Sequence, residues 1–222
     1  MDSTALVTAA VFTIAAVTMT VQGECPDIVS KADWRAAPVT HRQNLTIPVP
    51  YVLIHHTYIP GPCNTSAECS RSMRSMQRYH QGKGWYDIGY HFCIGGDNKV
   101  YEGRGWDIVG AHSPKYNFMS IGICFIGDYR AVLPSETMLD LSKSLIECGV
   151  DRGSIKSDYK LLGHRQVRPT ECPGDALYNL IQTWPHWDPM IDIVPREEST
   201  ESSTSSDIDD EENLADSDTI DM

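Results

Sequence analysis

Short apolar runs alternate along this chain with segments of helical periodicity, and this alternation restricts the possible folds more than any other feature. Residues 51–57, 120–126 and 159–163 are short and mostly apolar, which is typical of buried strands. Residues 88–94 and 99–102 flank a Gly-Gly-Asp-Asn turn and predict a hairpin. The chain therefore supplies about five strands.

Three other segments predict helices. Residues 70–80 place apolar side chains on one helical face. Residues 134–149 begin with proline and end with glycine, as helices commonly do. Residues 175–184 form a last helix, which Pro185 ends. Strands that alternate with helices predict a single α/β domain, in which about three helices cover a central mixed β-sheet of about five strands.

Charge separates a tail from the globular part of the chain. The net charge is −12, and residues 196–222 carry eleven acids and one arginine, a net −10. Residues 24–195 carry a net −1, so no basic field predicts nucleic acid as a partner. The tail has too little apolar surface to offset its ordering entropy, so we expect it to be disordered. It would serve to solubilise the domain or to contact a partner.

Residues 1–23 are typical of a signal peptide. An apolar stretch at 5–17 precedes Val21 and Gly23, small side chains at the positions that signal peptidase prefers. No Lys or Arg precedes the stretch, which leaves an uncleaved anchor as the alternative, but the stretch is short and threonine-rich for a hydrocarbon core of ~30 Å. We therefore expect a secreted, extracellular domain at 24–195 without a stable membrane anchor.

Three residues have the chemistry of metal ligands. His55 lies at the end of one apolar run, His164 follows another, and Cys172 comes eight residues later. Two imidazoles and one thiolate leave the fourth tetrahedral position of zinc open, which is the arrangement of a catalytic site. The spacing alone also fits ordinary core or surface histidines, and it leaves Cys172 as half of a disulfide or as a buried free thiol.

A series of motifs indicates one family. In chain order they are Trp34-Arg35-Ala36-Ala37, Ile54-His55-His56-Thr57, Met-Arg-Ser-Met-Gln-Arg-Tyr-His at 73–80, Asp87-Ile88-Gly89-Tyr90, Tyr-Glu-Gly-Arg-Gly-Trp at 101–106, Gly110-Ala111-His112, Gly163-His164-Arg165, Cys-Pro-Gly-Asp-Ala-Leu at 172–177 and Trp184-Pro185-His186. With these nine motifs in this order, the chain resembles a peptidoglycan recognition protein, an animal relative of phage-type zinc amidases. The resemblance covers about residues 25–186.

The resemblance implies a zinc cofactor and a catalytic site. Amidases of this family hold zinc through the residues that match His55, His164 and Cys172, whereas its non-catalytic receptors typically have serine at the cysteine position. The amidases also use the tyrosine and threonine that match Tyr90 and Thr170. The implied function is a secreted zinc-dependent N-acetylmuramoyl-L-alanine amidase, which hydrolyses the lactyl–L-alanine amide of bacterial peptidoglycan in innate immunity. The alternative is a peptidoglycan-binding receptor without catalysis.

The resemblance also implies a substrate preference. Members that prefer diaminopimelate-type walls tend to carry the residues that match Gly84, Trp85 and Arg104. A guanidinium suits the additional carboxylate of diaminopimelate, because it can hold a carboxylate in bidentate fashion; the alternative for Arg104 is a surface salt bridge. The other expected substrate contacts are His56, Thr57, Tyr58, His80 and His112. The side chain of His56 could instead face the opposite side of its strand, since neighbouring residues alternate.

Seven cysteines leave at least one sulfur outside a disulfide. The resemblance implies two disulfides, Cys25–Cys148 and Cys63–Cys69. Cys93 and Cys124 lie on apolar strands and are expected to be buried free thiols. Cys172 is then the odd sulfur, as a metal ligand requires; the alternative is a disulfide from Cys172 to Cys93 or Cys124.

Overall fold

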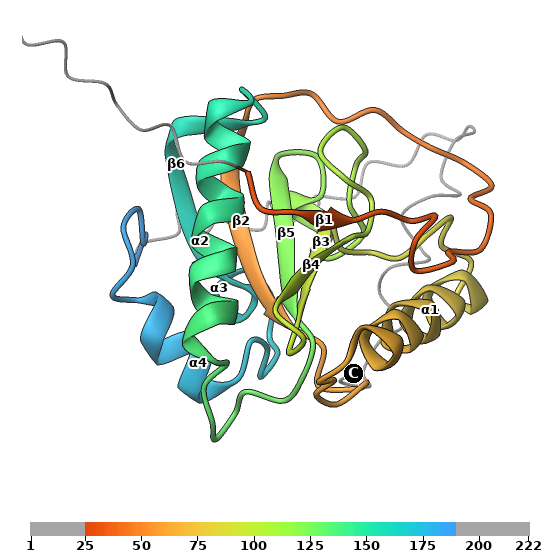
Figure 1. The fold of residues 1–222 in the computed structure, drawn as a ribbon. Helices are drawn as coiled ribbons and strands as arrows, with labels where there is room; N and C mark the ends of the chain where they lie inside the picture. The colour runs from red at the N-terminus through yellow and green to blue at the C-terminus, as the bar shows by residue number, and fades with distance from the viewer. Residues whose placement is uncertain (1–24, 190–222) are drawn as a thin grey trace, which may run out of the picture.

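A central six-stranded sheet organises the chain (Figure 1). The computed structural model describes residues 25–189, so the predicted signal peptide 1–23 and tail 196–222 lie outside the described residues. The strands are β1 (Ile28–Val29), β2 (Val49–His56), β3 (Phe92–Gly95), β4 (Lys99–Glu102), β5 (Ser120–Phe125) and β6 (Ile155–Gly163). The helices are α1 (Ser66–Gly82), α2 (Glu136–Asp151), α3 (His164–Val167) and α4 (Asp175–Ile181), with a short 3-10 helix η1 (Pro114–Tyr116).

The sheet is mixed, as predicted, with the order β1-β4-β3-β5-β2-β6. Strands β3, β5, β2 and β6 run parallel to one another, and β4 returns antiparallel to β3 as the predicted hairpin. The one strand that the sequence did not predict is β1, which has only two residues and pairs with β4 at the edge of the sheet. A strand this short has no hydrophobic period, so the sequence pattern does not show it.

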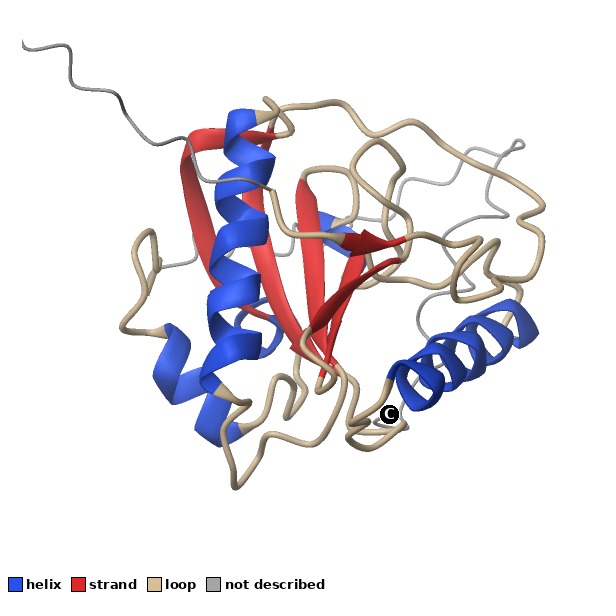
Figure 2. Ribbon diagram, viewed as in Figure 1, coloured by secondary structure: helices blue, strands red, loops and turns tan. Residues whose placement is uncertain are grey.

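Helices cover both faces of the sheet (Figure 2). On one face, α2 and α4 contribute Leu145 and Leu177 to a large apolar core with Ile54 and Phe125. On the other face, α1 contributes Met73 to a smaller core. The α/β prediction is therefore confirmed, with one apolar core on each face of the sheet. Within residues 25–189, no helix combines the length and the apolar composition needed to cross a membrane.

Local side-chain chemistry moves several element boundaries from their predicted positions. Helix α1 begins at Ser66, earlier than expected, because Thr65 and Glu68 form a capping box at its N-terminus. Helix α2 begins after Ser135, whose hydroxyl accepts a hydrogen bond from the Met138 amide. Strand β6 begins at Ile155, and its exposed polar residues conceal this first half from a search for apolar runs.

The disulfides confirm two predictions and correct a third. Cys25–Cys148 and Cys63–Cys69 are bonded as expected. The expectation of free thiols at Cys93 and Cys124 is wrong, because these two residues form a third disulfide. They lie directly opposite each other on the parallel strands β3 and β5, with Cα atoms 4.5 Å apart, which is within the range that a disulfide spans. Cys172 is the single free cysteine among residues 25–189.

The third disulfide predicts a measurable stabilisation. Cys93 and Cys124 are 31 residues apart, and closing a loop of this length is expected to contribute about 3–4 kcal/mol. Replacing both with alanine should lower the free energy of unfolding by about this amount, measured by denaturant titration. The matched control is the Cys63–Cys69 pair, whose separation of 6 gives about 2 kcal/mol. Three free thiols per unfolded, unreduced chain, instead of one, would contradict the bond.

Candidate metal centre

The sheet brings His55 and His164 to one edge. His55 is the penultimate residue of β2, and His164 follows the last residue of β6, the parallel neighbour of β2. Ile54 and Gly163 are partners in this register, so the two histidines leave adjacent strands at the same level. The carboxyl ends of parallel strands are where α/β sheets commonly bind ligands.

A loop adds Cys172 to these histidines. One potential ligand atom from each of His55, His164 and Cys172 lies within 4.8 Å of the other two. The structure therefore brings together the three residues that the sequence singles out, on two strands and a loop. Their role as metal ligands stays a prediction of the sequence.

Short-range contacts fix the loop that carries Cys172. The hydroxyl of Thr170 accepts a hydrogen bond from the Cys172 amide at 3.2 Å, and the carbonyl of Cys172 accepts one from the Arg165 amide at 2.9 Å. Gly174 has a φ of 89°, and a Cβ there would lie 2.3 Å from the Tyr129 carbonyl carbon. A glycine is therefore required at this point, and the loop presses directly against the segment after β5.

The sulfur of Cys172 is buried beside the end of β2. The backbone amide of His56 donates a hydrogen bond to Sγ at 3.3 Å, and Nδ1 of His55 lies 3.8 Å from Sγ. The carbonyl oxygen of the same residue, His56, lies 3.7 Å from Sγ, so both of its backbone polar groups contact the sulfur.

Burial keeps the histidines of this centre neutral. It lowers the pKa of His164 to about 3 and holds the pKa of His55 well below the usual value, with further lowering of both by neighbouring charged groups. A neutral imidazole has the lone pair that a metal needs. Both ring nitrogens of His164 are buried without a hydrogen-bond partner among the described residues. A buried orphan of this kind is costly, and a metal ion would satisfy it, so the residues present fit zinc.

Tyr90 borders the same centre. Its ring centroid lies 5.2 Å from that of His55. Burial raises the pKa of Tyr90, and the nearby Cys172 raises it further. The phenol therefore keeps its proton at neutral pH and is available as a hydrogen-bond donor.

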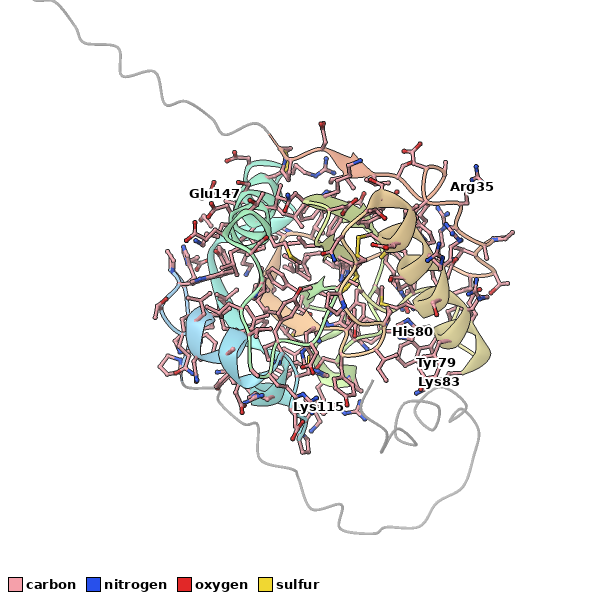
Figure 3. All side chains as sticks on the ribbon, turned by 60° about the horizontal axis from the view of Figure 1, so that its bottom comes forward. Arg35, Tyr79, His80, Lys83, Lys115 and Glu147 are labelled. Atoms are coloured by element: carbon pink, nitrogen blue, oxygen red, sulfur yellow. A yellow bond between two sulfur atoms is a disulfide. The ribbon has the colours of Figure 1, made fainter. Side chains whose placement is uncertain are left out.

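A line of rings connects the centre to a large pocket. From His55 and Tyr90 the line continues to His80, 6.0 Å from Tyr90 between ring centroids, and to Trp85, which stacks on His80 at 4.6 Å. His80 lies near the end of α1 beside Tyr79 and Lys83 (Figure 3). The pocket has a volume of about 870 Å³, and its lining includes Gly84, Trp85 and Arg104. The three residues expected to select the stem peptide therefore share one cavity, and the ring contacts of Trp85 link this cavity to the candidate metal centre.

Arg104 is held by backbone atoms. Its Nε donates to the Ile88 carbonyl at 2.8 Å and its Nη1 to the Val109 carbonyl at 2.6 Å. Among the described residues no carboxylate forms an ion pair with Arg104, so the alternative of a surface salt bridge is not observed. Burial lowers the pKa of Arg104, and the charge of Asp87, which is itself paired with Lys31, opposes this effect. Two hydrogen bonds to backbone carbonyls fix the guanidinium, and its other N–H groups can bind an anionic ligand.

The other expected substrate contacts lie around the end of β2. The ring of His56 is buried on the opposite side of β2 from His55, where its Nδ1 accepts a hydrogen bond from the Tyr129 amide at 3.2 Å. The hydroxyl of Thr57 is also used internally, with the Pro60 carbonyl and the Gly127 amide. Tyr58 is partly exposed and stacks under Arg130. Burial does not favour direct substrate contact by His56 or Thr57, and their role stays a prediction.

His112 is not among the residues that line this pocket, and its ring contacts His55. It is 8% exposed, and its Nδ1 is 3.0 Å from Nε2 of His55. Burial, with smaller effects of neighbouring charges, holds its pKa well below the usual value. The contact joins His112 to a candidate ligand.

Two charged residues near the centre, Asp128 and Arg130, belong to none of the sequence motifs. They form an ion pair at 2.8 Å just after β5, Arg130 also lies 3.5 Å from the Glu171 carboxylate, and Asp128 lies 4.0 Å from the His56 ring. They therefore connect the segment after β5 to the loop of Cys172. The sequence does contain a feature that could have indicated them: both residues follow shortly after an apolar strand, at the edge of the sheet where the parallel strands end.

Buried His91 predicts that stability falls with acidity. Burial lowers its pKa to about 3, whereas the unfolded chain takes up this proton near pH 6.5. Because the unfolded state then binds more protons, stability falls as pH decreases from about 6.5 to about 3, by about 1.4 kcal/mol per pH unit for this group. The free energy of unfolding can be measured at pH 6.5, 5.5 and 4.5 with a chelator present to keep the protein free of metal. Its decrease per pH unit should be smaller by this amount in His91→Asn than in the unmodified chain. Equal slopes would contradict the assignment.

Comparisons with known proteins agree with one family. A family model described as N-acetylmuramoyl-L-alanine amidase matches residues 45–175. Peptidoglycan-recognition protein LB of Drosophila melanogaster is 52% identical over 161 residues, which cover 72% of this chain and 69% of the fly protein. N-acetylmuramoyl-L-alanine amidase of Homo sapiens is 46% identical over 175 residues, 77% of this chain but only 30% of the human protein, so the chain spans less than a third of that relative.

Solved structures show the same likeness. One is peptidoglycan recognition protein-LE in complex with tracheal cytotoxin, which its description calls monomeric diaminopimelic acid-type peptidoglycan. It matches with a TM-score of 0.71 and 42% sequence identity, and the match covers 72% of this chain and 95% of that one.

Proposed function

The chain belongs to the peptidoglycan-recognition proteins with an N-acetylmuramoyl-L-alanine amidase domain, and we propose that it is a catalytic member that hydrolyses bacterial peptidoglycan with zinc. The observation that carries the proposal is the cluster of His55, His164 and Cys172, in which a thiol that forms no disulfide lies beside two neutral imidazoles. A relative with a printed amidase name, the human protein, supports the same activity.

The three ligands leave room for catalysis. We assign His55, His164 and Cys172 to hold zinc, because two imidazoles and one thiolate leave the fourth position of a tetrahedral ion open. When bound there, zinc supplies Lewis-acid chemistry: it polarises a carbonyl and lowers the pKa of a water ligand to about 7. The reaction adds water across the amide, so that the lactyl carbonyl carbon gains a hydroxyl group and the nitrogen of L-alanine leaves as an amine.

Two further residues act on this reaction. Tyr90 keeps its phenolic proton because burial raises its pKa, so it donates a hydrogen bond to the carbonyl oxygen as negative charge develops there. Thr170 accepts a hydrogen bond from the Cys172 amide, so it positions the loop of the thiolate ligand. These two residues correspond to the catalytic pair that the family resemblance implies.

The pocket beside the centre suits an anionic stem peptide. Arg104 is fixed by two backbone carbonyls and has no carboxylate partner among the described residues, so it can bind the additional carboxylate of diaminopimelate. The relative in complex with diaminopimelic acid-type peptidoglycan supports this class of ligand. We therefore propose a preference for diaminopimelate-type walls.

A substitution at Arg104 tests this preference. Arg104→Lys keeps the charge but loses the planar fork, so kcat/KM for a diaminopimelate-type muropeptide should fall about 10-fold, which corresponds to one charged hydrogen bond. The matched control is the lysine-type muropeptide, whose kcat/KM should stay within about twofold in the same variant. Equal hydrolysis of the two muropeptides by the unmodified chain would contradict the preference.

Secretion of the protein is also part of the proposal. We propose that residues 1–23 are a signal peptide and that the domain at 24–195 is secreted to act on bacterial walls in innate immunity, with the acidic segment 196–222 as a tail. The N-terminal sequence of the protein recovered from medium would test this directly: Glu24 is expected, and Met1 would contradict it.

The competing function is a receptor that binds peptidoglycan without cutting it. The cysteine at position 172 favours the enzyme, since serine there would remove a ligand and a negative charge. Incubating the zinc-loaded chain with diaminopimelate-type muropeptides separates the two functions. The enzyme releases a stem peptide with a free L-alanine amine and an intact disaccharide, whereas a receptor returns only the uncut muropeptide.

A further inference from the structure

His112 contacts the candidate ligand His55 on the side away from Cys172. Nδ1 of His55 faces the Cys172 sulfur at 3.8 Å, and Nε2 of the same ring lies 3.0 Å from Nδ1 of His112. The two rings meet edge to face, with centroids 5.0 Å apart and an interplanar angle of 84°. We propose that His112 is a positioning residue, which fixes the tautomer and the rotation of His55; this inference rests on the proposed zinc site.

The hydrogen bonds have one consistent direction. If Nδ1 of His55 binds the metal, its proton must be on Nε2, so His55 donates to Nδ1 of His112. His112 then carries its own proton on Nε2, which faces Oγ of Ser120 at 3.5 Å. Oγ of Ser120 in turn donates to the Tyr116 carbonyl at 2.6 Å. The series ends on a backbone acceptor, and His112 and Ser120 each accept one hydrogen bond and donate one.

The surrounding backbone is shaped to hold the His112 ring. A Cβ on Gly122 of β5 would lie 2.7 Å from three atoms of this ring, and a Cβ on Gly110 would lie 2.5 Å from it. Both positions therefore need glycine for the ring to occupy this space. The amide of His112 donates to Oδ1 of Asn117 at 2.8 Å, which also fixes the backbone of the residue. Ring and backbone are both held, so the acceptor offered to His55 has a fixed place.

A fixed acceptor has a specific consequence for metal binding. Histidine ligands usually donate their second N–H to a partner that fixes the ring and raises its basicity, and loss of this partner typically costs 10–100-fold in metal affinity. His112 is buried, so water does not readily replace it. The ligand His164 has no such partner, because both of its nitrogens are without a hydrogen bond among the described residues. Of the two candidate histidine ligands, only His55 therefore has a side-chain partner of this kind among the described residues.

Two variants of His112 separate hydrogen bonding from packing. In His112→Asn, Oδ1 occupies the place of Nδ1 and can still accept from His55, whereas His112→Leu fills similar space without an acceptor. Zinc affinity of the full chain, measured by competition with a chromophoric chelator, should fall about 10–100-fold in the leucine variant. The asparagine variant should stay within about threefold of the unmodified chain. Unfolding of the zinc-free proteins reports any general loss of structure.

Several results would overturn the inference. Equal zinc affinity of the leucine and asparagine variants, whether both normal or both weakened, would show that the acceptor at His112 does not matter. If the leucine variant does not fold, Ser120→Ala decides, because it removes the next acceptor and leaves both rings; at least about threefold weaker zinc binding is expected, and unchanged binding would contradict the inference. An unmodified chain that binds no zinc would overturn the proposed zinc site and this inference with it.

Discussion

Replacing Cys172 with serine is expected to abolish zinc binding at micromolar metal and, with it, the release of stem peptide. A serine hydroxyl stays protonated at neutral pH, so the site loses its one anionic ligand, and two imidazoles remain. Loss of a direct ligand should exceed the 10–100-fold effect of losing a supporting residue, so zinc affinity should fall at least about 100-fold and activity to below about 1%. Metal analysis after dialysis and a muropeptide assay measure the two effects.

The change at position 172 should leave the fold intact. Cys172 is outside all three disulfides, and its loop is fixed by the Thr170 hydroxyl, the Arg165 amide and Gly174, none of which uses the sulfur. The zinc-free variant should therefore unfold at the same denaturant concentration as the chelated unmodified chain, which is the matched control. A serine variant with full zinc content and full activity would contradict the assignment of Cys172 as a ligand.

Replacing Tyr90 with phenylalanine is expected to separate catalysis from metal binding. The substitution removes only the phenolic hydroxyl, which stays protonated at neutral pH because burial and the nearby Cys172 raise its pKa. Loss of one donor to a developing oxyanion typically costs about 10²–10³ in kcat. We expect a decrease of this size in kcat, with KM and zinc affinity changed by less than about threefold, measured by steady-state kinetics and chelator competition.

A second tyrosine provides the control for this variant. Tyr159 on β6 is partly buried, has a pKa raised by burial to about 12, and stacks on His186 at 4.2 Å between ring centroids, away from the metal centre. Tyr159→Phe should leave kcat unchanged. If Tyr90→Phe reduced zinc affinity and kcat equally, Tyr90 would be a support of the metal site and not a donor to the reaction.

The placement of two of the three candidate ligands follows from the sequence pattern, but their role does not, because the same pattern also fits ordinary histidines. His55 and His164 lie at the ends of apolar runs, and parallel neighbouring strands bring such ends to one edge. Cys172 lies in a loop, where no strand pattern gives its position, and the family motifs were needed to connect it to the two histidines. The family resemblance also indicated Gly84, Trp85 and Arg104, which the structure places in one pocket.

Contacts that depend on register could not be predicted from the pattern. Cys93 and Cys124 each lie on an apolar strand, but only the pairing of β3 with β5 places them opposite each other. Similarly, the motif that contains His112 does not show that its ring lies over Gly122 and faces His55, since this depends on the path of the segment before β5. Both the disulfide and the position of the His112 ring depend on which segments lie beside β5, and no local hydrophobic period of the sequence shows this.

Restoration of activity by zinc tests the central claim most directly. The purified full chain is stripped with a chelator, dialysed, and assayed on diaminopimelate-type muropeptides before and after one equivalent of zinc is added, with the products identified by mass spectrometry. We predict no cleavage by the stripped protein and, after zinc is added, an intact disaccharide together with a stem peptide that begins with a free L-alanine amine. Absence of stem peptide from protein that has taken up one zinc per chain would contradict the account.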